Sequence, residues 1–432
     1  METRQLIFLF FLLATIVAFL YSAWIIRANF KLTKKAYPVK QYGKRLKLTL
    51  INGFFQERIF RNPIAGIMHA LVFWGFCVIL LGSIEMVWDG ITGSERVLAG
   101  FGIFYDLFIG AGDVFAYVIA LFIIIFIIRR CCLNIPRLHG KELSHRNHQD
   151  AYLALTFILV LMITLAGLNI FYIAENQESF AGTYPVSELI APLFYSMSAH
   201  TIHLLHEINW WAHILLIFVF ANILPYSKHF HIFMSLPNVF YSRLTPLGKL
   251  ANMENITREV KIMLCPEVAA QIPETDPESA GERFGILDIE DATWKNYIDS
   301  LACTQCGRCS SVCPANITGK ELSPRKIIID IRRRMKEKSK GLRKEGKAYT
   351  DGKSIIRDYI KEEEIWACTT CNACAKECPL NIDHPTFIID MRRYLVMEEA
   401  NAPAALNSIF SNIENNGAPW QYSREDRLKW AE

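Results

Sequence analysis

The sequence predicts an all-α protein in which a bundle of five transmembrane helices is followed by a soluble helical domain. Two observations lead to this fold class. Hydrophobic residues make up 52% of the 432 residues and charged residues only 20%, and the apolar residues gather in long runs within the first half of the chain. The second half is more polar and carries two cysteine motifs of identical spacing.

Five apolar runs are long enough to cross a bilayer, because a helix of about 20 residues spans the hydrocarbon core. We expect these helices at about residues 6–26, 64–88, 111–128, 151–173 and 208–227, in a membrane domain that covers residues 1–235. Core helices of a large soluble protein are the alternative, but five runs with charge-free centres favour membrane spans. The first run is too long for the apolar part of a cleaved signal peptide, so we expect it to be retained.

The distribution of basic residues predicts the orientation, since Lys and Arg are enriched in cytoplasmic loops. Residues 27–61 contain ten basic residues and residues 129–150 contain five, whereas residues 89–110 contain one and residues 174–207 contain none. We therefore expect an inner (cytoplasmic) membrane protein with its N-terminus outside and everything after the fifth helix in the cytoplasm. Residues 192–207 are expected to lie along the outer membrane surface.

The two cysteine motifs predict two [4Fe–4S] clusters. Residues 303–314 read CTQCGRCSSVCP and residues 368–379 read CTTCNACAKECP. In such C-x2-C-x2-C-x3-C-P runs, three cysteines hold one cluster and the fourth reaches the other cluster, whereas zinc sites usually show cysteine pairs. We expect cluster 1 on Cys303, Cys306, Cys309 and Cys378, and cluster 2 on Cys368, Cys371, Cys374 and Cys313.

The segment between the motifs has helical periodicity, and the motifs begin far apart, at residues 303 and 368. This arrangement resembles the α-helical ferredoxin domain of heterodisulfide reductase C subunits and of succinate dehydrogenase iron–sulfur subunits. The resemblance implies a soluble α-helical ferredoxin domain over residues 286–400. Residues 236–285 are a predicted linker rich in proline, and residues 401–432 are a tail that we expect to be irregular and to pack on a partner.

Histidines in and near the membrane helices are candidate haem ligands, because ionisable residues in a bilayer are costly and usually functional. His213 and His231 are 18 residues apart. This separation is about 27 Å of helix, close to one hydrocarbon thickness, so the two lie near opposite faces. His69 begins near the cytoplasmic face and can meet His231, with His229 as a competing ligand. The alternative is that each imidazole only hydrogen-bonds to a backbone carbonyl.

The five helices, the outside N-terminus and the run from His213 to Pro225-Tyr-Ser-Lys-His-Phe-His231 resemble the cytochrome b (gamma) subunit of respiratory nitrate reductase. The resemblance implies an inner haem b on His69 and His231, and a role for His213 at an outer haem b. The family's second histidine in helix two is Ile79 here. An outer haem would therefore need another ligand, for which the candidates are His203, His200 and His206.

Two acidic residues near the outer ends of helices two and three, Glu85 and Asp113, are candidates to accept a quinol proton or bind a quinone oxygen. Solvation at the membrane surface is the alternative. The sequence contains no Gly-x-Gly-x-x-Gly run, no Walker A loop and no Cys-Cys-Gly motif. Two-electron chemistry on a soluble substrate is therefore expected on another polypeptide.

We expect an electron-transfer subunit of a quinone-linked oxidoreductase complex in a respiratory chain. It would pass electrons between a cytoplasmic partner and menaquinone or ubiquinone through two [4Fe–4S] clusters and b-type haem. Resemblance to fused membrane-bound iron–sulfur reductases implies a Cys-Cys-Gly subunit or an electron-transfer flavoprotein as partner, besides membrane lipid, and no nucleic acid. A haem-free membrane anchor for a ferredoxin and a redox-sensing membrane protein are the alternatives.

Overall fold

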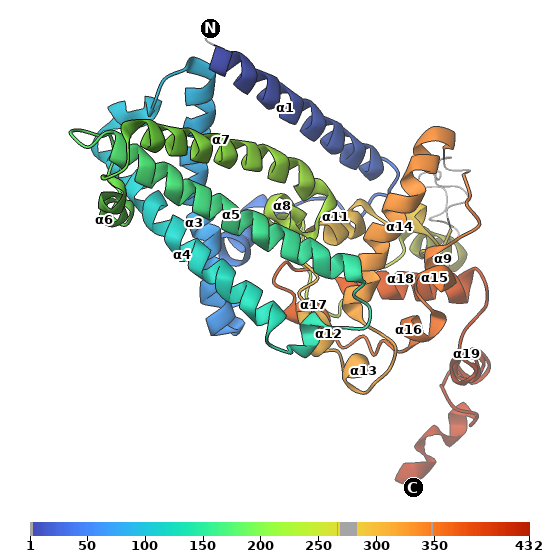
Figure 1. Cartoon of the computed structure of the whole chain (residues 1–432). Helices are drawn as coiled ribbons and strands as arrows, with labels where there is room; N and C mark the ends of the chain where they lie inside the picture. Colours follow the sequence, from blue (N-terminus) through green and yellow to red (C-terminus); the bar gives the residue numbers. More distant parts are fainter. Residues whose placement is uncertain (1–2, 266, 268–282, 347–348) are drawn as a thin grey trace.

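The computed structural model describes residues 3–265, 267, 283–346 and 349–432 (Figure 1). Over these residues the regular structure is helical, and strand-like pairing is limited to isolated bridges between Lys34 and Thr293 and between Ile356 and Ile360. The predicted all-α fold class is confirmed, with the long apolar helices in the first half of the chain and the cysteine motifs in the second.

Five helices are long and apolar enough to cross a membrane. They are α1 (Thr3–Phe30), α3 (Pro63–Thr92), α4 (Ile103–Cys131), α5 (His145–Glu175) and α7 (Ala199–Ile223). Each begins before its predicted apolar run and the first four also end beyond it, whereas α7 ends at Ile223, before the predicted end at 227. The start of α7 is capped by Ser198, whose hydroxyl accepts from the backbone N–H of Thr201. Residues 199–207, expected along the membrane surface, are therefore the first turns of α7.

Helices α3, α4, α5 and α7 pack side by side, and α1 lies at the edge of the bundle (Figure 1). Small residues allow the close approach of α3 and α4: a Cβ on Gly75 would lie 2.6 Å from the ring of Phe115. Phe8 anchors α1, because it is fully buried and its ring centroid lies 5.8 Å from that of Trp210. Many other apolar side chains of α1 are exposed, which suits a helix that faces lipid.

Short helices connect the long ones. They are α2 (Tyr42–Leu48), a π-helix (Thr49–Phe54), α6 (Ser187–Ile190) and 3-10 turns at Ile59–Arg61, Val97–Phe101, Pro136–Leu138, Ala191–Phe194, Leu224–Tyr226 and Lys228–Phe230. Two further helices, α8 (His231–Phe240) and α9 (Glu254–Leu264), fall within or overlap the predicted linker. Residues 266 and 268–282 of that linker lie outside the described residues.

The ferredoxin domain is built around α14 (Pro324–Glu345) and α18 (His384–Met397). Its core holds a continuous apolar cluster that includes Ile327, Ile331 and Phe387. The other helices are short: α11 (Trp294–Ala302), α12 (Arg308–Ser311), α13 (Pro314–Ile317), α15 (Ile355–Asp358), α16 (Glu362–Trp366), α17 (Ala373–Glu377) and a 3-10 turn at Ile289–Asp291. These short helices frame the two cysteine loops.

The tail is more regular than the sequence predicted. Helix α19 (Ala404–Asn416) and a 3-10 helix (Arg424–Ala431) extend away from the ferredoxin domain (Figure 1). The prediction of an irregular tail was wrong for these residues. Pro403 precedes α19, and Gly417 ends it in the left-handed conformation (φ +65°), so both boundaries follow the usual preferences of helix ends.

The ferredoxin domain docks on the end of the bundle that carries the basic loops. Asn238 of α8 donates to the backbone carbonyl of Leu380 at 2.8 Å, and Lys295 donates to Asn238 at 3.0 Å. On α14, Arg332 donates to the carbonyl of Ser227 at 2.9 Å. These buried or half-buried contacts fix the cysteine loops relative to the membrane helices.

Candidate metal centres

The first candidate site is a hollow of about 330 Å3, open space included, which we call the cluster-1 hollow. Three of its cysteines come from the loop between α11 and α12 and the first turn of α12, and the fourth directly follows α17. The cysteines that line it are Cys303, Cys306, Cys309 and Cys378. The fold therefore brings together the four residues that the sequence assigned to cluster 1.

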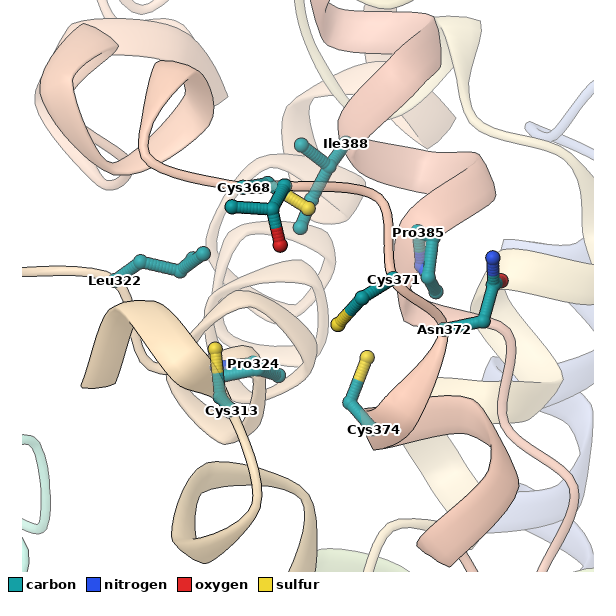
Figure 2. Close-up of a pocket in the computed structure, with 10 residues that line it drawn as sticks. Cys313, Leu322, Pro324, Cys368, Cys371, Asn372, Cys374, Pro385 and Ile388 are labelled. Atoms are coloured by element: carbon teal, nitrogen blue, oxygen red, sulfur yellow. The ribbon is translucent and has the colours of Figure 1, made fainter. Parts of the chain in front are cut away.

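The second site, the cluster-2 hollow, measures about 300 Å3, open space included. Figure 2 shows four sulfur atoms turned toward one space, three from the second motif and one from the start of α13. They belong to Cys313, Cys368, Cys371 and Cys374. Cys371 is exposed, whereas Cys313 and Cys374 are buried, so this hollow opens toward the surface at one corner.

The two cysteine loops share one backbone conformation. Gln305 and Gly307 in the first loop adopt positive φ values of 57° and 76°, and Thr370 and Asn372, at the same motif positions in the second, adopt 55° and 60°. A β-branched threonine in this region is a backbone outlier, and such strain gathers at binding sites. A Cβ at position 307 would lie 2.5 Å from the carbonyl oxygen of Arg137, so only glycine fits there.

Burial disfavours the thiolate form of the buried cysteines Cys303 and Cys378 in the cluster-1 hollow. Burial raises the pKa of the Cys303 thiol to about 11 and that of the Cys378 thiol to about 12. Thiolates are nevertheless the form that binds metal. The positive charge of bound iron would supply the missing stabilisation, so we expect cluster binding to release protons.

Each hollow presents four thiols, which is the ligand set of a [4Fe–4S] cluster. A zinc ion binds its cysteine ligands at about 2.3 Å, so its ligands converge on one point. A [4Fe–4S] cluster binds each thiolate through a different iron, so its four cysteines surround a wider space. Both hollows fit this requirement.

His69 on α3 and His231 at the start of α8 are close enough to interact electrostatically. The Nδ1 of His69 lies 3.1 Å from Oε1 of Gln56, and the Nδ1 of His231 lies 3.3 Å from the carbonyl oxygen of Lys228. Metal-binding histidines usually donate one ring N–H to such an acceptor and leave the other nitrogen for the metal. Each of these two imidazoles therefore has an oxygen acceptor for its Nδ1.

His229 stays a competitor for His231. Its Nδ1 lies 3.0 Å from the hydroxyl of Ser227, and the centroids of the two imidazole rings are 5.9 Å apart.

The outer candidates are not brought together. His213 on α7 is buried, and its Nδ1 lies 3.0 Å from the carbonyl oxygen of Leu161 on α5. His203 is exposed and its Nδ1 lies 2.7 Å from Glu175, which His206 also contacts at 2.9 Å. His203 and His213 are separated by ten residues of one helix, about 15 Å, so they cannot bind the same iron.

The two acidic candidates, Glu85 and Asp113, are both buried. Glu85 accepts from the backbone N–H of Leu98 at 3.0 Å and from the hydroxyl of Tyr105 at 3.4 Å. Asp113 accepts from the backbone N–H groups of Val186 and Ser187, from the Ser187 hydroxyl and from Asn169. Asp113 therefore fastens an outer loop to α4 and α5, which is a structural role.

Sequence reasoning missed the residues that join the hollows to the bundle. Gln56 is 4% exposed, has a positive φ of 57° and lies beside His69. Arg58 donates to the carbonyl oxygen of Cys378 at 3.1 Å, and Arg308 donates to the carbonyl oxygen of Arg58 at 3.0 Å. The basic residues within residues 27–61 predicted the orientation in the membrane only, because nothing in the sequence shows that they contact the backbone carbonyl groups of cysteines.

A membrane-spanning bundle joined to two four-cysteine hollows defines a membrane electron-transfer protein with iron–sulfur clusters. Residues 302–382 match the family model of the 4Fe-4S dicluster domain. The chain is 28% identical over 98% of its length to the probable iron-sulfur-binding oxidoreductase FadF of Bacillus subtilis, covering 60% of that protein. It is 27% identical over 97% of its length to the EtfAB:quinone oxidoreductase of Syntrophomonas wolfei, covering 58% of that protein.

The ferredoxin domain has relatives of the predicted kind. A heterodisulfide reductase C-like protein of Archaeoglobus profundus is 30% identical over 30% of this chain, covering 58% of that protein. The predicted resemblance to heterodisulfide reductase C subunits is confirmed for this domain. The chain spans about three fifths of the length of the first two relatives. No solved structure matches the chain.

Proposed function

We propose that the protein passes electrons between a soluble redox partner and the membrane quinone pool. Cys303, Cys306, Cys309 and Cys378 would hold cluster 1, Cys368, Cys371, Cys374 and Cys313 would hold cluster 2, and His69 and His231 would hold haem b. Bound there, these groups supply one-electron carriers. The residues of the chain would fix the sequence in which electrons pass the two clusters and the haem, and would keep water away from cluster 1 and the haem.

One observation carries this proposal: the peptide from Gln56 to Arg58 contacts both the inner histidine pair and the cluster-1 hollow. Gln56 accepts from His69, while Arg58 donates to the carbonyl oxygen of Cys378. Arg308, which lines the cluster-1 hollow, is also within electrostatic reach of His69. These contacts support a short path for electron tunnelling between the two sites, and the exposed Cys371 offers a surface position at the cluster-2 hollow.

The basic loops support an orientation in which the ferredoxin domain is cytoplasmic. This domain docks on loops within residues 27–61 and 129–150. The first of these ranges carries ten basic residues and the second carries five. Cytoplasmic loops of inner-membrane proteins are enriched in Lys and Arg. We infer that the N-terminus of α1 lies outside.

Two of the relatives support two kinds of partner. A relative called an EtfAB:quinone oxidoreductase favours an electron-transfer flavoprotein as donor and menaquinone or ubiquinone as acceptor. The name of the heterodisulfide reductase C-like relative indicates a subunit of a larger complex, so a Cys-Cys-Gly subunit is the second partner that we propose.

Of the two acidic candidates for a quinol proton, Glu85 is the better one, because Asp113 is engaged with four donors from the outer loop and α5.

The experiment is a reduced-minus-oxidised spectrum of the purified full-length protein with its iron content measured. A sharp b-type α band is expected, and His69→Ala should abolish it. His203→Ala is the matched control and should leave the band unchanged, because the structure places this histidine at an exposed ion pair.

Two outcomes would favour the alternatives. A protein with full iron content but no b-type band would be a haem-free anchor for its ferredoxin domain. Clusters that stay oxidised when quinol is added, in a protein that contains haem, would favour a redox sensor.

A further inference from the structure

Positive charge is distributed unequally between the two hollows. The guanidinium groups of Arg308 and Arg325 line the cluster-1 hollow, and Arg58 donates to the carbonyl oxygen of its ligand residue Cys378. Among the described residues that line the cluster-2 hollow, none is charged. Its nearest counterpart is Arg392, which donates to the carbonyl oxygen of Cys368 at 2.5 Å.

Most of the charge at cluster 1 is not cancelled by a direct ion pair. Arg325 pairs with Glu142, so its charge is offset. Arg58, Arg308 and Arg332 donate instead to backbone carbonyl groups. Arg332 also interacts electrostatically with Cys303. Among the described residues, none of these three guanidinium groups forms a direct ion pair, although Glu57 and Glu377 act on Arg58 from a greater distance.

A backbone N–H group favours cluster 2 instead: the amide of Thr370 donates to the sulfur of Cys368 at 3.4 Å. Such hydrogen bonds stabilise the reduced state of a cluster, as nearby cations do, because reduction adds negative charge.

We propose that Arg58 and Arg308, at the contact with the membrane bundle, raise the reduction potential of cluster 1 above that of cluster 2. An electron that enters at the exposed corner near Cys371 then moves inward, toward His69. One electron is exchanged: the cluster-2 core is oxidised from the 1+ to the 2+ state while the cluster-1 core is reduced from 2+ to 1+, with no bond or proton transferred. This inference rests on the two clusters of the proposed function and does not require the haem.

Solvent acts in the opposite direction, because water near the exposed Cys371 also stabilises a reduced cluster. We expect the fixed cations to dominate. They lie at a partly buried interface, where the effective dielectric is lower than in water and each charge acts more strongly. The order of the two potentials therefore reports which effect is larger.

The test is a redox titration of the full-length protein in detergent, followed by electron paramagnetic resonance. A Cys371→Ser variant assigns the cluster-2 signal. In the unmodified protein, cluster 1 should be reduced at the more positive potential. Arg58→Gln and Arg308→Gln should each shift the cluster-1 potential to more negative values and leave the cluster-2 potential unchanged. Arg58→Lys keeps the positive charge, so its cluster-1 potential should stay close to that of the unmodified protein.

Arg392→Gln is the matched control, since it removes the cation beside cluster 2 and should shift only the cluster-2 potential. The proposal is overturned if cluster 2 is the more positive one in the unmodified protein, a measurement that needs no variant to fold. It is also overturned if cluster 1 keeps its potential in both Gln variants with full iron content. Absence of haem in the same samples would contradict the proposed quinone pathway, but it would not affect the comparison of the two cluster potentials.

Discussion

Arg325 of the ferredoxin domain donates through Nη2 to Oε1 of Glu142, in the loop between α4 and α5, at 2.7 Å. The arginine is 1% exposed, and its Nη1 also donates to the carbonyl oxygens of Arg137 and of Gln305 in the first cysteine loop. A Cβ on Gly140 would clash with this guanidinium, so the glycine permits the approach. One side chain thus ties the cluster-1 loop to the membrane domain.

Glu142→Gln should loosen this docking, because it leaves the buried guanidinium without its carboxylate. Loss of one partner of a buried ion pair typically costs about 3–5 kcal/mol. We expect a lower denaturation midpoint and faster protease cleavage between the two domains. As the control, Glu321→Gln removes an exposed pair with Lys361 and should change the denaturation midpoint little, because solvent screens such pairs. Equal effects of the two substitutions would contradict a docking role for Glu142.

The exchange of fourth ligands between the motifs can be tested by single substitutions. Cys313→Ser should alter the cluster on the second motif, and Cys378→Ser the cluster on the first, because each residue lines the hollow of the other motif. The measurement is the electron paramagnetic resonance spectrum of each reduced variant, with iron and sulfide content. A Cys313→Ser protein in which only the first cluster changes would show that each motif keeps its own fourth cysteine.

Gln56→Leu should weaken haem binding without removing a ligand. The substitution takes away the acceptor for the Nδ1 of His69, and losing such a supporting hydrogen bond typically costs about 10–100-fold in metal affinity. The measurements are haem content per polypeptide and the haem reduction potential. Gln41→Leu is the control, since Gln41 shares the positive φ but is exposed at the start of α2. Unchanged haem content and potential in Gln56→Leu would argue against His69 as a ligand.

Asp113→Ala should destabilise the outer loop. It removes the acceptor for four donors, including the backbone N–H groups of Val186 and Ser187. Leaving buried donors unpaired costs about 1–3 kcal/mol for each group that water does not reach. We expect a lower melting temperature in detergent and faster cleavage of residues 176–198 by protease. Asp106→Ala, two turns earlier on the same helix and partly exposed, should have a small effect. Comparable losses in both variants would dismiss the anchoring role.

The sequence by itself determined the five long helices and the positions of both cysteine motifs. These features are local: an apolar run of helical length excludes almost every alternative, and a C-x2-C-x2-C run places three thiols within a single loop. The tail shows the limit of this reasoning, because α19 buries no residue against the core, yet its boundaries at Pro403 and Gly417 follow ordinary helix-end preferences.

Only the tertiary structure decided which residues from distant segments meet. It brought Cys378 to the first loop and Arg58 to the carbonyl oxygen of Cys378, and it placed Gln56 beside His69. It also separated His203 from His213, since both lie on α7. Contacts of this kind depend on how whole helices dock, and docking depends on the summed packing and hydrogen bonding of many side chains rather than on any short pattern in the chain.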